Sequence, residues 1–156
     1  MDDNALQLIE EFGMYFESVG LTRMAGRIIG FLLICDPPHQ SMPDIVEALG
    51  AAKSSISTAL WQLQQLYLVE RFRIPGERRD FFRASSDMWN RSFRARMHQV
   101  TALRELAERG LGLLDDAPDA QRKRLELMRD HNQFIETEFP KLLDRWDDIK
   151  RQKGYE

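Results

Sequence analysis

The chain has 156 residues and one cysteine, is 43% hydrophobic and 30% charged, and carries a net charge of −3. These figures exclude an internal disulfide, and the longest strongly apolar run, Ile28–Cys35, is far too short to span a bilayer. Residues 51–98 hold nine basic and four acidic side chains, so the acidic total does not exclude a nucleic acid as partner. The N-terminus has no apolar leader, so we expect a cytoplasmic protein without a membrane partner.

Two helices are predicted first, over residues 4–19 and 23–35. The first has apolar side chains at helical spacing, and the second is apolar around most of its circumference and should lie centrally. Gly26 and Gly30, one turn apart, would let another helix approach closely. We expect residues 1–35 to support the core and a dimer interface.

A short helix, a tight turn and a second helix follow. Ser41 and Asp44 are typical of a helix start, and Gly50 ends the short helix. The second helix is predicted from about Lys53 to Tyr67, because apolar residues recur there at helical spacing. Two helices joined in this way favour a helix-turn-helix.

A β-hairpin is predicted next, with strands over residues 68–74 and 80–84 around a turn at 75–79. A hairpin after a helix-turn-helix is the order of a winged helix-turn-helix. The expected fold class is therefore mostly α, with an α+β winged DNA-binding domain at residues 36–86 and long N- and C-terminal helices.

Polar side chains cover one side of the predicted second helix, and arginines gather in the hairpin. Short hydrogen-bonding side chains can read base edges in the major groove, and arginines at a hairpin tip can reach the minor groove or the backbone. The alternative is a solvated edge whose charges block strand pairing. The candidate DNA-contacting residues are Lys53, Ser54, Ser55, Ser57, Thr58, Gln62, Arg73, Arg78 and Arg79.

Residues 87–156 are expected to be helical and to form a dimerisation region. One helix begins at Ser85 or Ser86 and runs toward Leu114, and a second follows the break at 115–118. The second has a seam in steps of three and four residues, which is typical of a helix packed along another helix. The seam residues are Leu125, Met128, Asn132, Ile135, Phe139, Leu142, Trp146 and Ile149.

Two residues on this helix interrupt its apolar or regular character. Asn132 could fix the register if it finds a partner across the seam, and Pro140 should kink the helix without splitting it. A symmetric dimer would cover so long a stripe, and an intramolecular bundle core is the alternative.

The segment Ala48–Leu60, with Leu68–Val69 and Pro75–Asp80, resembles the MarR superfamily and is most similar to its GbsR-like branch. The resemblance implies a homodimer with one winged domain per subunit and an interface of terminal helices. It also implies a repressor, often released by a small ligand.

The resemblance assigns roles within the winged domain. It places bases against Ser54, Ser55 and Thr58, the DNA backbone near Lys53 and Ser57, and the wing tip at Arg78 and Arg79. Ala52 departs from the family pattern, because related helices commonly place a capping serine there. Either Ser54 caps the helix one turn later or the helix start is weaker by about 1 kcal/mol.

Several aromatic residues could wall a ligand pocket or simply pack in the core. GbsR-like relatives suggest choline-type cations, which aromatic faces attract. Trp61 lies near the proposed DNA-facing side, and packing against the wing is its alternative. The pocket candidates are Phe12, Tyr15, Phe16, Trp89 and Phe93, and Trp146 is a further aromatic of this kind.

Other reactive side chains give no sign of chemistry. Cys35 is interpreted as an inert small hydrophobe rather than a redox sensor. The histidines His39, His98 and His131 lack metal-ligand spacing, and no phosphate loop or nucleophile elbow is present in the sequence. We therefore expect no enzyme, no metal and no cofactor.

Together these patterns predict a sequence-specific, ligand-responsive homodimeric repressor of transcription. Two winged domains would read double-stranded DNA at pseudo-palindromic half-sites about 34 Å apart. A winged protein-interaction module and a small-molecule-binding helical dimer are the alternatives, and the effector is not identified.

Overall fold

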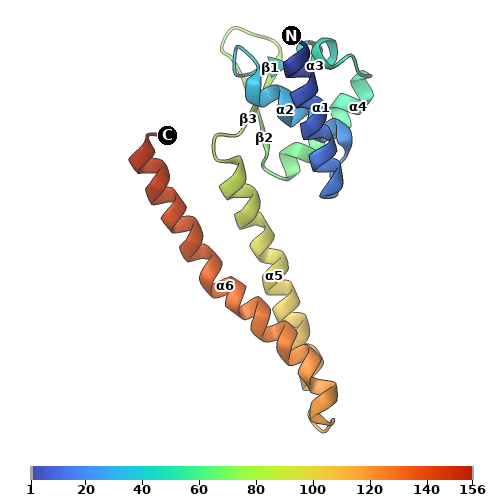
Figure 1. Ribbon diagram of the computed structural model, residues 1–156, viewed down its shortest axis with the longest axis vertical. Helices are drawn as coiled ribbons and strands as arrows, with labels where there is room; N and C mark the ends of the chain where they lie inside the picture. Colours follow the sequence, from blue (N-terminus) through green and yellow to red (C-terminus); the bar gives the residue numbers. More distant parts are fainter. Residues whose placement is uncertain (1, 156) are drawn as a thin grey trace. The chain divides into compact units, whose positions relative to one another are not determined.

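The computed structural model describes residues 2–155 (Figure 1). This part of the chain contains six helices and three short strands, joined by turns and loops. Every helix predicted from the sequence is present. The chain divides into a winged unit, Met1–Ser92, and an α5–α6 unit, Phe93–Glu156. In order the elements are α1 (Asp3–Ser18), α2 (Arg23–Ile34), β1 (Gln40–Ser41), α3 (Met42–Leu49), α4 (Lys53–Gln65), β2 (Val69–Arg73), β3 (Asp80–Ala84), α5 (Met88–Gly112) and α6 (Asp119–Lys153).

Helix α2 forms the centre of the winged unit, as its apolar circumference predicts. Ile28 and Ile29 are fully buried, and the helix packs against α1, α3, α4 and β3. The predicted close approach occurs at Gly26, where an added Cβ would lie 2.5 Å from the carbonyl oxygen of Phe12. Any side chain at this position would push α1 away from α2.

The helix-turn-helix forms from local signals that the sequence carries. A capping box begins α3, in which the Ser41 backbone N–H donates to the Asp44 carboxylate over 2.9 Å. Gly50 ends α3 with φ +57°, a left-handed conformation that glycine adopts without strain. Helix α4 then starts after Ala52 without a side-chain cap, so the alternative in which Ser54 caps the helix is wrong.

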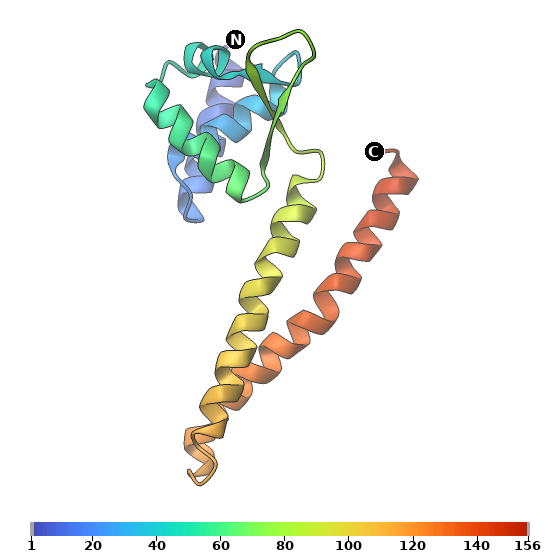
Figure 2. The same cartoon turned by 180° about the vertical axis from the view of Figure 1, so that it is seen from behind.

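The sheet contains one strand that the sequence did not predict. Its antiparallel order is β1–β3–β2, and β1 pairs Gln40 with Phe82. A strand of two residues shows no alternation, so only its pairing with β3 defines it. The wing, Val69–Ala84, is the β2–β3 hairpin, drawn in green in Figure 2. Within it Arg73 lies opposite Asp80.

Helix α5 begins later than predicted. Ser85 still belongs to the end of the sheet, because its backbone N–H donates to the Leu68 carbonyl and its hydroxyl donates to Glu70 over 3.0 Å. The first helical residue is Met88, and the helix continues to Gly112. The predicted break at residues 115–118 separates it from α6.

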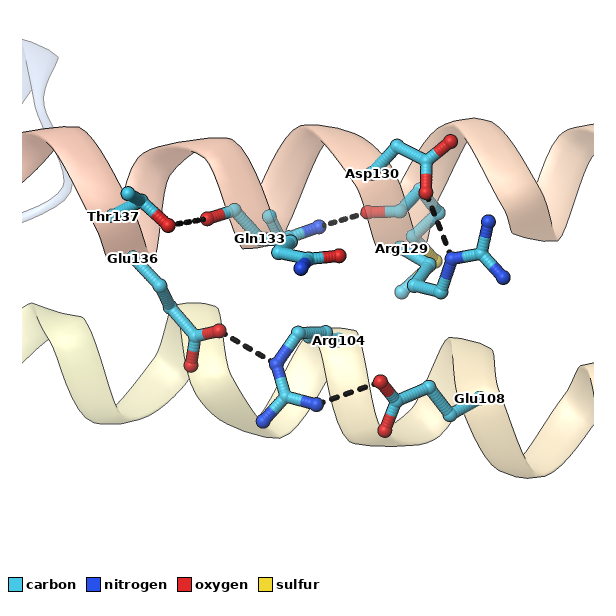
Figure 3. Close-up of polar contacts among 9 residues, drawn as sticks. Arg104, Glu108, Arg129, Asp130, Gln133, Glu136 and Thr137 are labelled. Carbon is cyan, nitrogen blue, oxygen red and sulfur yellow. Dashed lines mark hydrogen bonds and ion pairs between the residues drawn. The ribbon is translucent and has the colours of Figure 1, made fainter.

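The α5–α6 unit is a helical hairpin held by apolar contacts and ion pairs. A Cβ added at Gly110 would lie 2.7 Å from Leu125 Cδ1, so glycine allows the close approach of α6. Arg104 joins the helices through Glu136 over 2.6 Å and bonds Glu108 over 2.8 Å (Figure 3). Helix α6 runs through Pro140 without splitting.

Within residues 2–155, none of the helices combines the length and the apolar character that crossing a membrane requires.

Candidate nucleic-acid interface

Helix α4 has one buried face and one exposed polar face. Ile56, Leu60 and Leu63 are almost fully buried and fix the helix on the core of the winged unit. The exposed face carries most of the predicted DNA-contacting side chains of this helix. They are Lys53, Ser54, Ser55, Ser57 and Thr58. The structure therefore presents these five residues together on a rigidly supported helix.

The start of α4 adds backbone donors to this face. No side chain caps the helix, since Ala52 occupies the N-cap position. The first N–H groups of an uncapped helix remain available to an anion, and the helix dipole favours a negative charge there. Lys53 is exposed at the same end. This end of the helix is suited to a phosphate.

Gln62 and Trp61 lie on the next turn of α4 and differ in how far their side chains are exposed. Gln62 is half-buried, and its amide oxygen accepts from the Thr22 hydroxyl over 3.5 Å, so its DNA contact stays a prediction. Trp61 is 64% exposed, which leaves little of its ring packed against the wing. Trp61 follows Ser57 by four residues and Thr58 by three, so it lies on the same exposed face of α4 as these two residues. The sequence had left two positions open for Trp61, and its exposure favours the DNA-facing side over packing against the wing.

The wing holds two arginines in place through one carboxylate. Asp80 accepts from Arg71 over 2.6 Å and from Arg73 over 3.0 Å. These bonds hold the pKa of Asp80 below its usual range, so the carboxylate stays charged. Arg71 was missed from the sequence, although its spacing of two residues from Arg73 places both side chains on one face of β2. Exposed ion pairs of this kind are weak and leave the guanidinium groups able to meet a phosphate.

Arg78 and Arg79 lie in the exposed turn of the wing, as predicted. Arg79 stands over the ring of Phe81 at 5.4 Å and approaches Glu77 at 3.6 Å. Gly76 has φ +88°, which the turn requires before these arginines. The turn therefore presents two cations beyond the sheet.

A second carboxylate ties the wing to the start of α5. Glu70 accepts from Arg83 over 2.9 Å and from Arg91 over 2.9 Å, besides Ser85. Burial raises the pKa of Glu70, but the hydrogen bonds of Arg83 and Ser85 and the two charges lower it overall. This network holds the base of the wing in one arrangement.

The predicted ligand-pocket aromatics do not all lie in one unit. Phe16 is buried and stacks on Trp89, with ring centroids 6.4 Å apart, and Phe12 and Tyr15 also contact it. Phe93 belongs to the α5–α6 unit and contacts Phe139 at 5.9 Å. These contacts favour core packing for Phe16, and a pocket stays a prediction.

Reactive and metal-binding groups are sparse. Burial raises the pKa of the Cys35 thiol, which keeps it mostly protonated at neutral pH and favours its interpretation as a small hydrophobe that reacts slowly. Across residues 2–155, no three His, Cys, Asp or Glu side chains gather as metal ligands would.

The seam of α6 divides into two parts. Leu125, Met128, Ile135 and Phe139 are half-buried, whereas the later positions Leu142, Trp146 and Ile149 are 56%, 40% and 39% exposed. Asn132 is buried, but its amide donates to the Met128 carbonyl of its own helix over 2.7 Å rather than across the seam. The later part of the seam stays exposed in the single chain, and its role in a dimer stays a prediction.

Comparison with known proteins places this arrangement in a family. Residues 87–149 match the family described as "MmpR5-like MarR family transcriptional regulator". The chain is also 37% identical over 145 residues to the HTH-type transcriptional regulator MmpR5 of Mycobacterium tuberculosis, covering 93% of this chain and 88% of that protein. The chain belongs to the MarR family of transcriptional regulators.

A solved structure agrees with this assignment. The crystal structure of a transcriptional regulator that is 37% identical matches with a TM-score of 0.81, over 93% of this chain and 99% of that chain. The predicted MarR resemblance and the mostly helical winged fold are thereby confirmed. Both similar proteins are described as transcriptional regulators and not as enzymes.

Proposed function

We propose that this MarR-family chain is a homodimeric repressor that binds a pseudo-palindromic DNA site, with α4 in the major groove and the wing beside it. One observation carries the proposal: the exposed hydroxyl face of α4 is backed by the fully buried Ile56 and Leu63. A supported helix of this kind can hold hydrogen-bonding groups against base edges. The MmpR5 relative is named as an HTH-type transcriptional regulator, which supports the same role.

The dimer interface is proposed on the later part of the α6 seam. Leu142, Trp146 and Ile149 expose large apolar surfaces on one stripe. A second copy would cover them symmetrically and set the two α4 helices about 34 Å apart. The two recognition helices would then meet successive major grooves on one side of the duplex.

A small ligand would regulate such a dimer by favouring one spacing of the α4 helices over another. Ligand response, the GbsR-like branch and cytoplasmic location are parts of the proposal that rest on the sequence resemblance. The stacked aromatics around Phe16 support a ligand role less than a packing role.

Fluorescence anisotropy with the promoter DNA upstream of its own gene tests the proposal. We expect nanomolar binding that depends on sequence and weakens steeply with salt, because phosphate contacts release counterions. A scrambled duplex of equal length is the control. Equal binding to both duplexes, or none, would favour a winged protein-interaction module instead.

Two classes of variant separate base reading from backbone contact. Removing Arg78 and Arg79 should weaken binding to every sequence and lower the salt slope by about 1 for each lost phosphate contact. Replacing Ser55 or Thr58 with Ala should change the preferred sequence at single positions instead. If both classes act identically, α4 and the wing do not have the separate roles proposed.

A further inference from the structure

An open groove of about 660 Å³ lies in the winged unit, between α1, the end of α2 and α3. Its volume falls within the usual range for small-molecule sites, about 300–1,000 Å³. None of the proposed DNA-contacting residues lines it. It is therefore a separate surface feature of this unit.

Part of the lining of the groove is apolar. Leu6 and Ile34 are 41% and 40% exposed, and the mostly buried Phe31 also lines the groove. Large apolar side chains in contact with water gain free energy when a ligand covers them. The groove therefore suits a ligand with an apolar body.

The lining of the groove also includes carboxylates. Asp36, Asp44 and Glu47 line the groove, and none of its lining residues within the described range 2–155 is lysine or arginine. Asp36 and Glu47 are exposed, and the Ser41 hydroxyl lowers the pKa of Asp44, which keeps that carboxylate ionised at neutral pH. These carboxylates give the groove an anionic character.

The basic residues of the surrounding segment are engaged elsewhere. Residues 2–50 contain two, Arg23 and Arg27. Both pair with Glu10, at 3.2 Å and 2.7 Å. They are therefore held on another part of the unit. Outside this segment the charge of Arg79 acts on Asp44, so the anionic character relies on Asp36 and Glu47.

We propose that this groove binds a small organic cation with an apolar body. The apolar body would cover Leu6 and Ile34, and the cation would lie near Asp36 and Glu47. An anion of the same size would gain the same apolar contact but would be repelled by the carboxylates. Discrimination by charge is therefore the specific property of the site.

The position of the groove suggests what binding would do. Glu47 and Asp44 belong to α3, which packs on α4, and Gln40 of β1 pairs with β3 of the wing. A bound cation would contact both supports of the proposed DNA interface. This regulatory consequence rests on the proposed function, whereas binding to the groove does not.

Cys35 provides a reporter, because it lines the groove and is the single cysteine of the chain. The full chain is alkylated with iodoacetamide at pH 8.5, and the rate is followed by mass spectrometry. Tetraphenylphosphonium and tetraphenylborate are the probes, since they match in size and differ in sign. We expect at least threefold slower alkylation with the cation and no change with the anion. Equal protection by both ions, or by neither, overturns the proposal.

Charge variants locate the binding. The double variant Asp36→Asn with Glu47→Gln should weaken tetraphenylphosphonium binding roughly threefold to tenfold in calorimetry, as expected for two exposed charges. The control, Glu17→Gln with Asp116→Asn, removes two exposed charges elsewhere and should leave the affinity unchanged. Equal weakening in both variants would mean a general field effect and would overturn the site. Calorimetry needs no DNA, so failure of the proposed function leaves this result intact.

Discussion

The winged unit and the α5–α6 unit differ in how much of their apolar surface they cover by themselves. The winged unit encloses a core centred on α2, where Ala25, Ile28 and Ile29 are fully buried. In the α5–α6 unit many large apolar side chains remain in water, including the seam residues Leu142 at 56% and Trp146 at 40% exposed. One unit buries a core of its own, whereas the proposed dimer would cover the exposed apolar side chains of the other.

The stability of the two units should therefore depend differently on protein concentration. Core packing is independent of concentration, whereas a stability that arises from association depends on protomer concentration. Variants in the winged unit should therefore act on folding, and variants on α6 should act on assembly.

The largest expected effect is in the α2 core. Ile28→Ala should lower the free energy of unfolding by roughly 2–5 kcal/mol, because it leaves a cavity in a fully buried site. Urea unfolding followed by circular dichroism measures it. Leu127→Ala is the matched control and should cost less than about 0.5 kcal/mol. Similar losses in both variants would remove the contrast between the units.

The second-largest effect should be on dimerisation. Trp146→Asp should raise the dimer dissociation constant at least about thirtyfold, because a charge would enter an apolar interface in place of a large aromatic. Sedimentation velocity over a range of concentrations checks this. Leu113→Asp, in the turn after α5, should leave the mass unchanged. An unaltered dimer with Asp at position 146 would place the interface elsewhere.

The third effect concerns Trp61, the exposed aromatic residue on the proposed DNA-binding face of α4. Trp61→Ala should weaken operator binding about fivefold, since truncating an aromatic that becomes covered on binding costs about 1 kcal/mol or more. Anisotropy titrations at fixed salt give the affinity. Leu33→Ala removes an exposed apolar side chain of α2 and should have no effect. The same affinity in both variants would exclude Trp61 from the interface.

The smallest effect concerns Glu70 at the base of the wing. Because its folded pKa is lowered, its contribution is present above the ordinary glutamate pKa of about 4.3 and is lost as the pH falls toward the lowered value. Glu70→Gln should therefore reduce stability by about 1 kcal/mol or less at pH 7, and the difference should vanish in acid. Urea titrations across pH 3–7 follow it, with Glu17→Gln as control. A difference that persists in acid would mean that charge is not the cause.

Local signals predicted most of the fold. The Ser41–Asp44 capping box, the turn at Gly50 and the apolar stripe from Ile56 to Leu63 each act within a few residues, so the chain reveals them directly. The β1 strand escaped prediction because its pairing with β3 spans some forty residues. The start of α5 moved from Ser85 to Met88 because Ser85 bonds Leu68 and Glu70, which are distant in sequence.

The sequence likewise predicted the part of the candidate DNA site on α4 but missed one arginine of the wing. Lys53, Ser54, Ser55, Ser57 and Thr58 lie on one helix face, and helical periodicity alone places them together. Arg71 was missed because its role depends on sharing Asp80 with Arg73 across the hairpin.

The sequence by itself determined the winged helix-turn-helix and the polar face of α4, because capping, turn chemistry and periodicity are local. Only the tertiary structure decided which half of the α6 seam stays open, that Asn132 bonds its own helix, and that carboxylates meet apolar residues in a groove. These features depend on segments far apart in the chain coming together, and burial is a property of the packed molecule rather than of any one residue.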